Sequence, residues 1–202
     1  SLKTDKKIKL GLKGNHKGVK LVIDAPKAEV TNRGKFKIVE INVRKWVEKA
    51  NGNGLVVKSR ESSIEVSKNA KVTFIRFLKS GAKADVSIKG EVSDLVVEKK
   101  AELSLSGKTD LVPVTVNAEG TKVTSSVQVE LIANKNTETI FKKGAEGSSV
   151  KATNDETKVV VKNETKEEVF VENASGDETV LMSGAYKELK NGVLADKGGY
   201  EN

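Results

Sequence analysis

Cysteine is absent from this chain of 202 residues, and histidine occurs only once, as His16. Without cysteine the chain forms no disulfides, binds no zinc through thiolates and has no thiol nucleophile. With a single histidine, a histidine-based metal site is excluded, and a Ser-His-Asp triad would depend on His16 alone. We therefore expect no metal and no cofactor, and we assign no catalytic residue.

Aromatic residues are also scarce, at 4% of the chain, and proline occurs twice. No apolar run approaches the roughly 18 residues that a membrane span requires, so none is expected. Hydrophobic residues make up 37% of the chain and charged residues 32%. This composition is apolar enough for one folded domain of ordinary size, with a narrow core.

The positive charge is concentrated in the first quarter of the chain. The whole chain has 36 basic and 28 acidic residues, but residues 1–50 alone contain 14 basic and five acidic ones. Such asymmetry indicates an anionic partner, or lysines that keep strand edges soluble and unpaired. Lysine outnumbers arginine 32 to four, and phosphate and base recognition favours the planar arginine fork, so nucleic acid is the less favoured partner.

Short apolar segments recur at a nearly constant spacing. Residues 28–41 align with 64–77 without a gap at an offset of 36, and residues 84–90 align with 101–107 at an offset of 17. Runs of three to five residues, rich in Val and Ile, return near Leu21, Ile38, Val56, Phe74, Val96, Val114 and Val129. Such runs favour strands, and the Asn, Gly, Ser, Lys and Asp residues between them are typical of turns.

A unit of about 18 residues cannot bury its apolar face alone, but stacked units can. The sequence therefore predicts an all-β fold, a single-stranded parallel β-helix (β-solenoid), right-handed, with six to eight coils and a length of roughly 30–40 Å. The alternative is a β-sandwich, which also has short strands separated by turns. The translational repeat and the scarcity of Asn-Gly hairpin turns favour the solenoid.

The two ends and one internal segment depart from this spacing. We expect residues 1–17 to form an N-terminal cap strand, 18–155 the solenoid, and 156–202 a β-rich C-terminal cap or appendage whose last ten residues are frayed. Residues 44–54 interrupt the repeat, and their sequence predicts one or two helical turns ended by glycine.

The segments GEVSDLVVEKKAELSLSGKTDLVPVTVNAEGTKVTSSVQVEL (90–131) and KKGAEGSSVKA (142–152) resemble a known class of module. They are similar to the repetitive Val/Thr/Lys-rich β-solenoid modules of secreted and cell-surface proteins of Gram-positive anaerobic bacteria. The resemblance covers residues 18–155. It implies an extracellular or cell-surface location, a structural or adhesive role, and other domains of a larger surface protein as neighbours.

Two pairs of acidic residues occupy matching positions in the repeats. Glu29 matches Glu65 at the offset of 36, and Asp85 matches Glu102 at the offset of 17. Stacked carboxylates about 5–10 Å apart are the arrangement that glycoside hydrolysis requires. A polysaccharide lyase or hydrolase is therefore one interpretation, and a solvated ladder with intervening lysines is the favoured one.

Trp46, in the segment that interrupts the repeat, is the candidate ligand-binding residue, with Arg44, Lys45 and Lys49 beside it. A tryptophan among basic residues can stack on a sugar ring and attract acidic groups. The alternative is that Trp46 buries its ring and fastens the segment to the solenoid.

Three functional hypotheses follow. The first, which we favour, is a non-catalytic structural or adhesive module of a bacterial surface protein. The second is a carbohydrate-binding or carbohydrate-processing β-helix that uses the surface around Trp46. The third is binding of a polyanion, such as teichoic acid or nucleic acid, through the basic N-terminal quarter. Cell-wall polymers or glycans are the expected partners, and the oligomeric state is left open.

Overall fold

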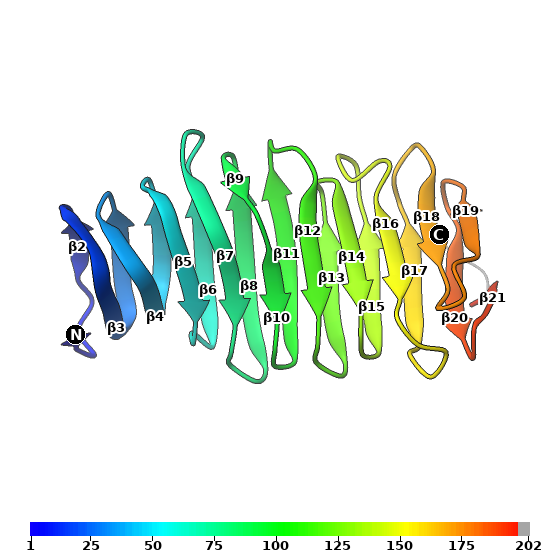
Figure 1. Ribbon diagram of the computed structural model, residues 1–202, viewed down its shortest axis with the longest axis horizontal. Coiled ribbons are helices and arrows are strands. Elements are labelled where there is room, and N and C mark those ends of the chain that lie inside the picture. The colour runs from blue at the N-terminus through cyan, green and yellow to red at the C-terminus, as the bar shows by residue number, and fades with distance from the viewer. Residues whose placement is uncertain (198–202) are drawn as a thin grey trace.

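Short parallel strands, stacked coil upon coil, form one elongated β-solenoid (Figure 1). The computed structural model describes residues 1–197, and within them all regular structure is β-strand. The solenoid has about nine turns, which confirms the predicted all-β parallel β-helix and exceeds the predicted six to eight coils. No helix among these residues is long and apolar enough to cross a membrane.

The coils present two long parallel ladders, which we call the first and second sheets. The first sheet contains β1 (Leu2–Lys3), the early parts of β3 (Asn15–Asn32) and β4 (Lys35–Glu48), β5 (Asn51–Val57), β7 (Lys71–Phe77), β10 (Leu95–Val97), β12 (Val112–Val116), β14 (Val129–Ala133), β16 (Ser149–Ala152) and β18 (Val169–Glu172). The second sheet contains β2 (Lys9–Leu12), the later parts of β3 and β4, β6 (Glu61–Val66), β8 (Ala82–Ile88), β11 (Ala101–Gly107), β13 (Thr121–Ser125), β15 (Thr137–Phe141) and β17 (Val159–Asn163).

Inward-facing positions form rows along the axis, and most of their side chains are apolar. One such row in the first sheet consists of Leu2, Ile23, Ile41, Val57, Phe77, Val97, Val116, Ala133 and Ala152. Successive members are 16 to 21 residues apart in the sequence, so the coil length varies around the predicted 17 to 19. Because alternate residues of a strand face opposite sides, the core is a narrow column between the sheets.

Segment 44–54 is strand and not helix, which makes that prediction wrong. Strand β4 runs through Arg44 to Glu48 and pairs with β3 and β6, and β5 begins at Asn51. Trp46 and Glu48 point inward while Lys45 and Val47 alternate with them. The polar residues around Trp46 suggested a helix, but neighbouring coils on both sides supply ladder partners that override local propensity.

The parallel ladder extends beyond the predicted 18–155 at both ends. At the N-terminus β1 and β2 pair with β3 and complete a first coil. At the other end the parallel pairing continues to β18, and the antiparallel strands β19 (Glu178–Leu181), β20 (Tyr186–Lys190) and β21 (Val193–Asp196) then cover β17 and β18. These three strands form the small β-rich C-terminal cap that the sequence predicts. Part of the expected frayed tail is β21, and 198–202 lie outside the described residues.

A third, narrower side connects the end of each second-sheet strand to the start of the next coil. It lies at the top of Figure 1 and carries the two-residue strand β9 (Glu91–Val92). We call it the turn side, and in the first six coils it consists of residues 13–17, 33–37, 49–53, 67–73, 89–93 and 108–111.

Gly107, at the end of β11, is a position where the ladder requires glycine. Its φ is +123°, and a Cβ there would lie 2.0 Å from the carbonyl oxygen of Ile88 in the preceding coil. We expect Gly107→Ala to lower the free energy of unfolding by about 2–3 kcal/mol, through backbone strain and overpacking. Gly11→Ala is the control, because a Cβ at Gly11 has no neighbour within 4 Å. Urea denaturation of both variants checks this, and equal stability of the two would contradict it.

Candidate functional site: a basic groove on the turn side

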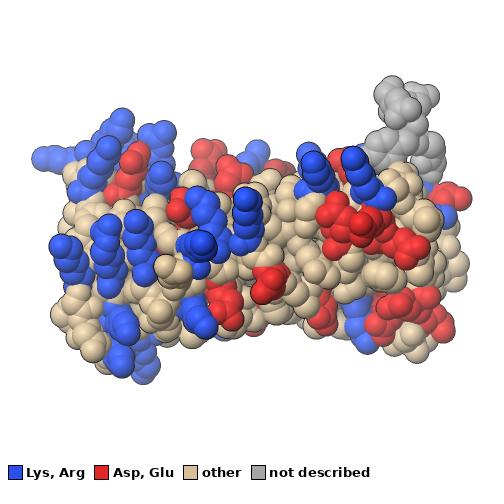
Figure 2. Space-filling model, turned by 90° about the horizontal axis from the view of Figure 1, so that it is seen from above, with Lys and Arg blue, Asp and Glu red and all other residues tan. Residues whose placement is uncertain are grey.

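The turn side of the first six coils concentrates positive charge. Its residues include ten bases and two acids, the acids being Glu91 and Asp110. The bases are Lys13, Lys17, Arg33, Lys35, Lys37, Lys49, Lys68, Lys71, Lys89 and Lys108. Figure 2, which views this side, shows Lys and Arg gathered over the N-terminal half and Asp and Glu over the C-terminal end.

Most of these bases have no acidic partner. Lys71 pairs with Glu91 at 3.0 Å and Lys89 with Glu65 at 3.6 Å, and the lysine side chains remain 70% and 52% exposed. The other eight form no ion pair with any residue of the described chain, 1–197. These eight bases form a positively charged surface that attracts an external anion.

Two adjoining hollows lie between these bases and share Lys71. The first, of about 590 Å³, is bordered by Lys17, Lys35 and Lys37, and Phe36 lies at its floor. The second, of about 640 Å³, lies further along the axis and is lined by Lys68, Asn69, Ala70, Lys71, Lys89, Gly90, Glu91, Lys108, Thr109 and Asp110. We call the two hollows together the basic groove. Both are shallow and open, which suits a polymer lying on the surface better than an enclosed small molecule.

An aromatic pair lies at the N-terminal end of the turn side, and one of its members, Phe36, lines the groove. The imidazole of His16 stacks on the ring of Phe36, with centroids 5.5 Å apart and an angle of 22° between the planes. Phe36 is buried and covers Gly34, where a Cβ would lie 2.8 Å from its Cε2 atom. His16 is exposed. The histidine that the sequence offered as a weak catalytic candidate therefore lies exposed on the turn side, stacked on a residue that lines the groove.

The turn that carries Lys35 and Lys37 is held by two buried asparagines. Asn32 donates to the Gly34 carbonyl (3.0 Å) and accepts from the Gly34 N–H (2.9 Å). Asn53, one coil further, donates to the same carbonyl (2.9 Å) and accepts from the Phe36 N–H (2.9 Å). These four bonds hold the backbone at Gly34 and Phe36, on either side of Lys35.

A buried carboxylate fastens both asparagines to the core. Glu48 is fully buried, and its Oε1 accepts hydrogen bonds from Asn32 Nδ2 (3.0 Å), Asn53 Nδ2 (3.2 Å) and the Ala50 N–H (2.9 Å). Its Oε2 accepts from Trp46 Nε1 at 3.1 Å. Burial raises the pKa of Glu48, and the hydrogen bonds from Ala50, Asn32, Trp46 and Asn53 act in the opposite direction. Glu48 is thus a positioning residue that links the core to the groove.

The four predicted ligand-binding residues are separated by this geometry. Trp46 has no exposed surface, so it cannot stack on a sugar, and it instead fills the core as the alternative interpretation proposed. Arg44 and Lys45 are exposed on strand β4, with Arg44 at the margin of a trough on the outer face of the second sheet. Lys49 alone lies on the turn side.

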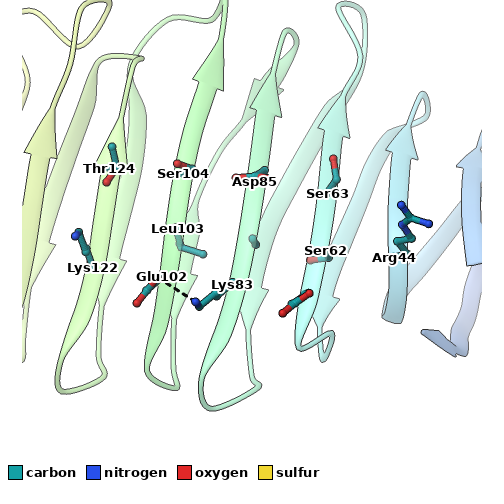
Figure 3. Close-up of a pocket in the computed structure, with 12 residues that line it drawn as sticks. Arg44, Ser62, Ser63, Lys83, Asp85, Glu102, Leu103, Ser104, Lys122 and Thr124 are labelled. Atoms are coloured by element: carbon teal, nitrogen blue, oxygen red, sulfur yellow. Dashed lines mark ion pairs between the residues drawn. The ribbon is translucent and has the colours of Figure 1, made fainter. Parts of the chain in front are cut away.

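That trough has a volume of about 550 Å³ and crosses β4, β6, β8, β11 and β13 (Figure 3). Its floor carries the charge-alternating row Glu61, Lys83, Glu102, Lys122, which continues to Glu138. The Lys83 Nζ and Glu102 Oε2 atoms are 4.0 Å apart, and both side chains are more than half exposed. Exposed pairs of this kind contribute little stability.

The predicted register of the paired acidic residues is wrong, although Asp85 and Glu102 both line this trough. Glu29 pairs with Lys45 and, one coil further, with Ser63, whereas Glu65 lies beside Val47. Asp85 lies beside Ser104, and Glu102 beside Lys83. Both predicted alignments are shifted by two residues, because the corners differ in length from coil to coil. A shift of two preserves the inward and outward alternation, so the sequence pattern cannot reveal it.

Sequence reasoning missed the groove because its residues come from six separate turns. A usable signal was present: a base directly precedes glycine at the end of a second-sheet run in Lys13-Gly14, Arg33-Gly34 and Lys89-Gly90.

No cluster of three or more His, Asp or Glu side chains within residues 1–197 has a geometry that could hold a metal ion. Comparisons of the whole chain matched no family model, no curated protein and no solved structure.

Proposed function

We propose that this protein is a non-catalytic adhesive module that holds a single-chain anionic polymer in its basic groove. The observation that carries the proposal is the excess of ten bases over two acids on the turn side, eight of the bases being unpaired within residues 1–197. A rod of stacked coils presents such a surface without needing flexible loops.

The kind of base supports a wall polymer or acidic glycan over nucleic acid. Nine of the ten bases on the turn side are lysine. The lysine ammonium group is a hydrated point charge that attracts phosphate, sulfate or carboxylate without bidentate geometry. The resemblance of 90–131 and 142–152 to surface modules of Gram-positive bacteria also supports a cell-surface location and an anionic wall polymer as the ligand.

The test is sedimentation of the full chain with purified Gram-positive cell wall, with and without its teichoic acid, at two salt concentrations. We expect binding to intact wall that weakens with salt and is lost with stripping, because counterion release drives polyanion binding. Reversing three groove charges, in Lys17→Glu/Lys35→Glu/Lys37→Glu, is expected to weaken binding about 100-fold, at roughly 1 kcal/mol per lost lysine contact.

The matched control is Lys27→Glu/Lys79→Glu/Lys99→Glu, which makes the same change in net charge at exposed lysines of the opposite edge. Circular dichroism of both variants verifies the fold, and a Lys→Gln triple in the groove serves if the reversal disturbs it. Equal loss in groove and control variants would contradict the proposal, as would unchanged binding by the groove variant. Equal retention on duplex DNA would assign the groove to nucleic acid instead.

A further inference from the structure

We infer that the bound polymer lies parallel to the solenoid axis, crossing six coils from Lys13 to Lys108. This inference rests on the proposed function and adds the direction and extent of the ligand. Five coil steps at the strand spacing of about 4.8 Å give a footprint of about 24 Å.

The direction follows from one row of bases at the corner where second-sheet strands end. The N–H of Arg33 donates to the carbonyl of Leu12, which precedes Lys13, and the N–H of Lys49 donates to that of Asn32. These bonds place Lys13, Arg33 and Lys49 on three successive coils in one row. Ser67 continues the row with Lys68 beside it, and Lys89 and Lys108 follow through the carbonyls of Val66 and Ile88. A polymer along the axis therefore meets a base at nearly every coil.

A polymer that followed a single coil would meet far fewer charges. Within the second coil the turn side offers Arg33, Lys35 and Lys37, and the chain then enters the first sheet at Ile38. Five residues span at most roughly 18 Å, and most coils carry only one or two bases in that span. The two hollows of the groove also follow one another along the axis and meet at Lys71.

The run of bases on the turn side is interrupted after Lys108, and the charge changes sign at the ninth coil. The seventh coil has no charged residue at 126–128, the eighth has Lys142 and Lys143 against Glu146, and the ninth has Glu164, Glu167 and Glu168 against Lys166. Glu167 and Glu168 are exposed, and Figure 2 shows acidic side chains gathered towards this end. A polyanion on the groove therefore meets no base at the seventh coil and is repelled at the ninth, so its continuous contact with bases ends at Lys108.

The experiment measures binding of linear inorganic polyphosphate fractions of defined length to the full chain. We expect the dissociation constant to fall steeply with polymer length up to about 24 Å and then to reach a plateau. Beyond that length it should change only with the number of positions at which a longer polymer can occupy the same footprint. A plateau already at a length of one or two coil steps, or no plateau within the length of the solenoid, would overturn the inference. No binding at any length would instead contradict the proposed function.

Two variants locate the ends of the footprint. In Lys89→Glu/Lys108→Glu, the polymer length at which the plateau begins is expected to shorten to about 14 Å, because three coil steps of the footprint remain. Glu167→Lys/Glu168→Lys is expected to move it up towards about 38 Å, the span of eight steps. Lys79→Glu/Lys99→Glu, on the opposite edge, is the control and leaves the plateau in place. A plateau that fails to move in either groove variant would show that the polymer does not lie along the axis.

Discussion

Replacing Trp46 with alanine is expected to lower the free energy of unfolding by about 3–5 kcal/mol, the usual cost of removing a large buried aromatic side chain. Trp46 is fully buried in the second-sheet row between Val30 and Ile64, and its indole N–H is a donor to Glu48. Removing it creates a cavity and leaves the carboxylate one donor short. Urea denaturation followed by circular dichroism measures the change.

Lys45→Ala is the control for this prediction, because Lys45 is the exposed neighbour on the same strand. We expect it to change stability by no more than about 0.5 kcal/mol. A Trp46→Ala protein of unchanged stability that had lost glycan binding would restore the sugar-stacking role that burial of the ring argues against.

Replacing Glu48 with alanine is expected to have an effect of similar size, about 3–5 kcal/mol, because buried donors left without an acceptor cost about 1–3 kcal/mol each before relaxation. The side chains of Asn32, Asn53 and Trp46 and the N–H of Ala50 lose their shared acceptor. The turn of Lys35 loses its anchor as well, so wall binding should weaken. Glu48→Gln retains one acceptor oxygen and should fall between wild type and Glu48→Ala in both measurements.

We also expect the free energy of unfolding to depend on pH through Glu48. Because burial raises the pKa of Glu48, the native chain binds this proton more tightly than the unfolded chain. The stability that Glu48 contributes is therefore complete below its unfolded pKa and is lost as pH rises through its raised native pKa. Glutamine does not titrate, so Glu48→Gln should not lose stability as pH rises. The difference in free energy of unfolding between this variant and wild type should therefore change between the unfolded and the raised native pKa of Glu48. A constant difference would contradict the prediction.

Glu40 is expected to affect the pH dependence of stability in the opposite direction, and it serves as an internal comparison. Hydrogen bonds from Lys58 and Lys20 lower its pKa, with their Nζ atoms 2.7 Å and 2.9 Å from its carboxylate oxygens. Its contribution is present above its unfolded pKa and is lost as pH falls through the lowered value. Glu40→Gln should therefore flatten the acid side of the stability profile, where Glu48→Gln does not.

The repeat of apolar runs predicted the β-solenoid because each run can be buried only by a neighbour of the same kind. Val39 and Ile75 lie two coils apart in one row, as the offset of 36 predicted. Ile41 and Phe77 lie two coils apart in another row. The same offset is wrong for Glu29, whose two-coil partner is Ser63. The turns that connect the two sheets differ in length between coils. The register over two coils depends on these turn lengths together, and no local residue pattern gives it.

Composition and periodicity by themselves determined that this chain forms stacked coils of strands, that its core is narrow and aliphatic, and that its positive charge lies in the first quarter. Those properties depend on which residue types alternate along the chain, and alternation is a local feature. Only the tertiary structure decided that Trp46 is buried, that Asp85 and Glu102 are two positions out of register, and that residues from six turns form one groove. Those outcomes depend on which residues of different coils become neighbours, and that register is set by packing across the whole solenoid.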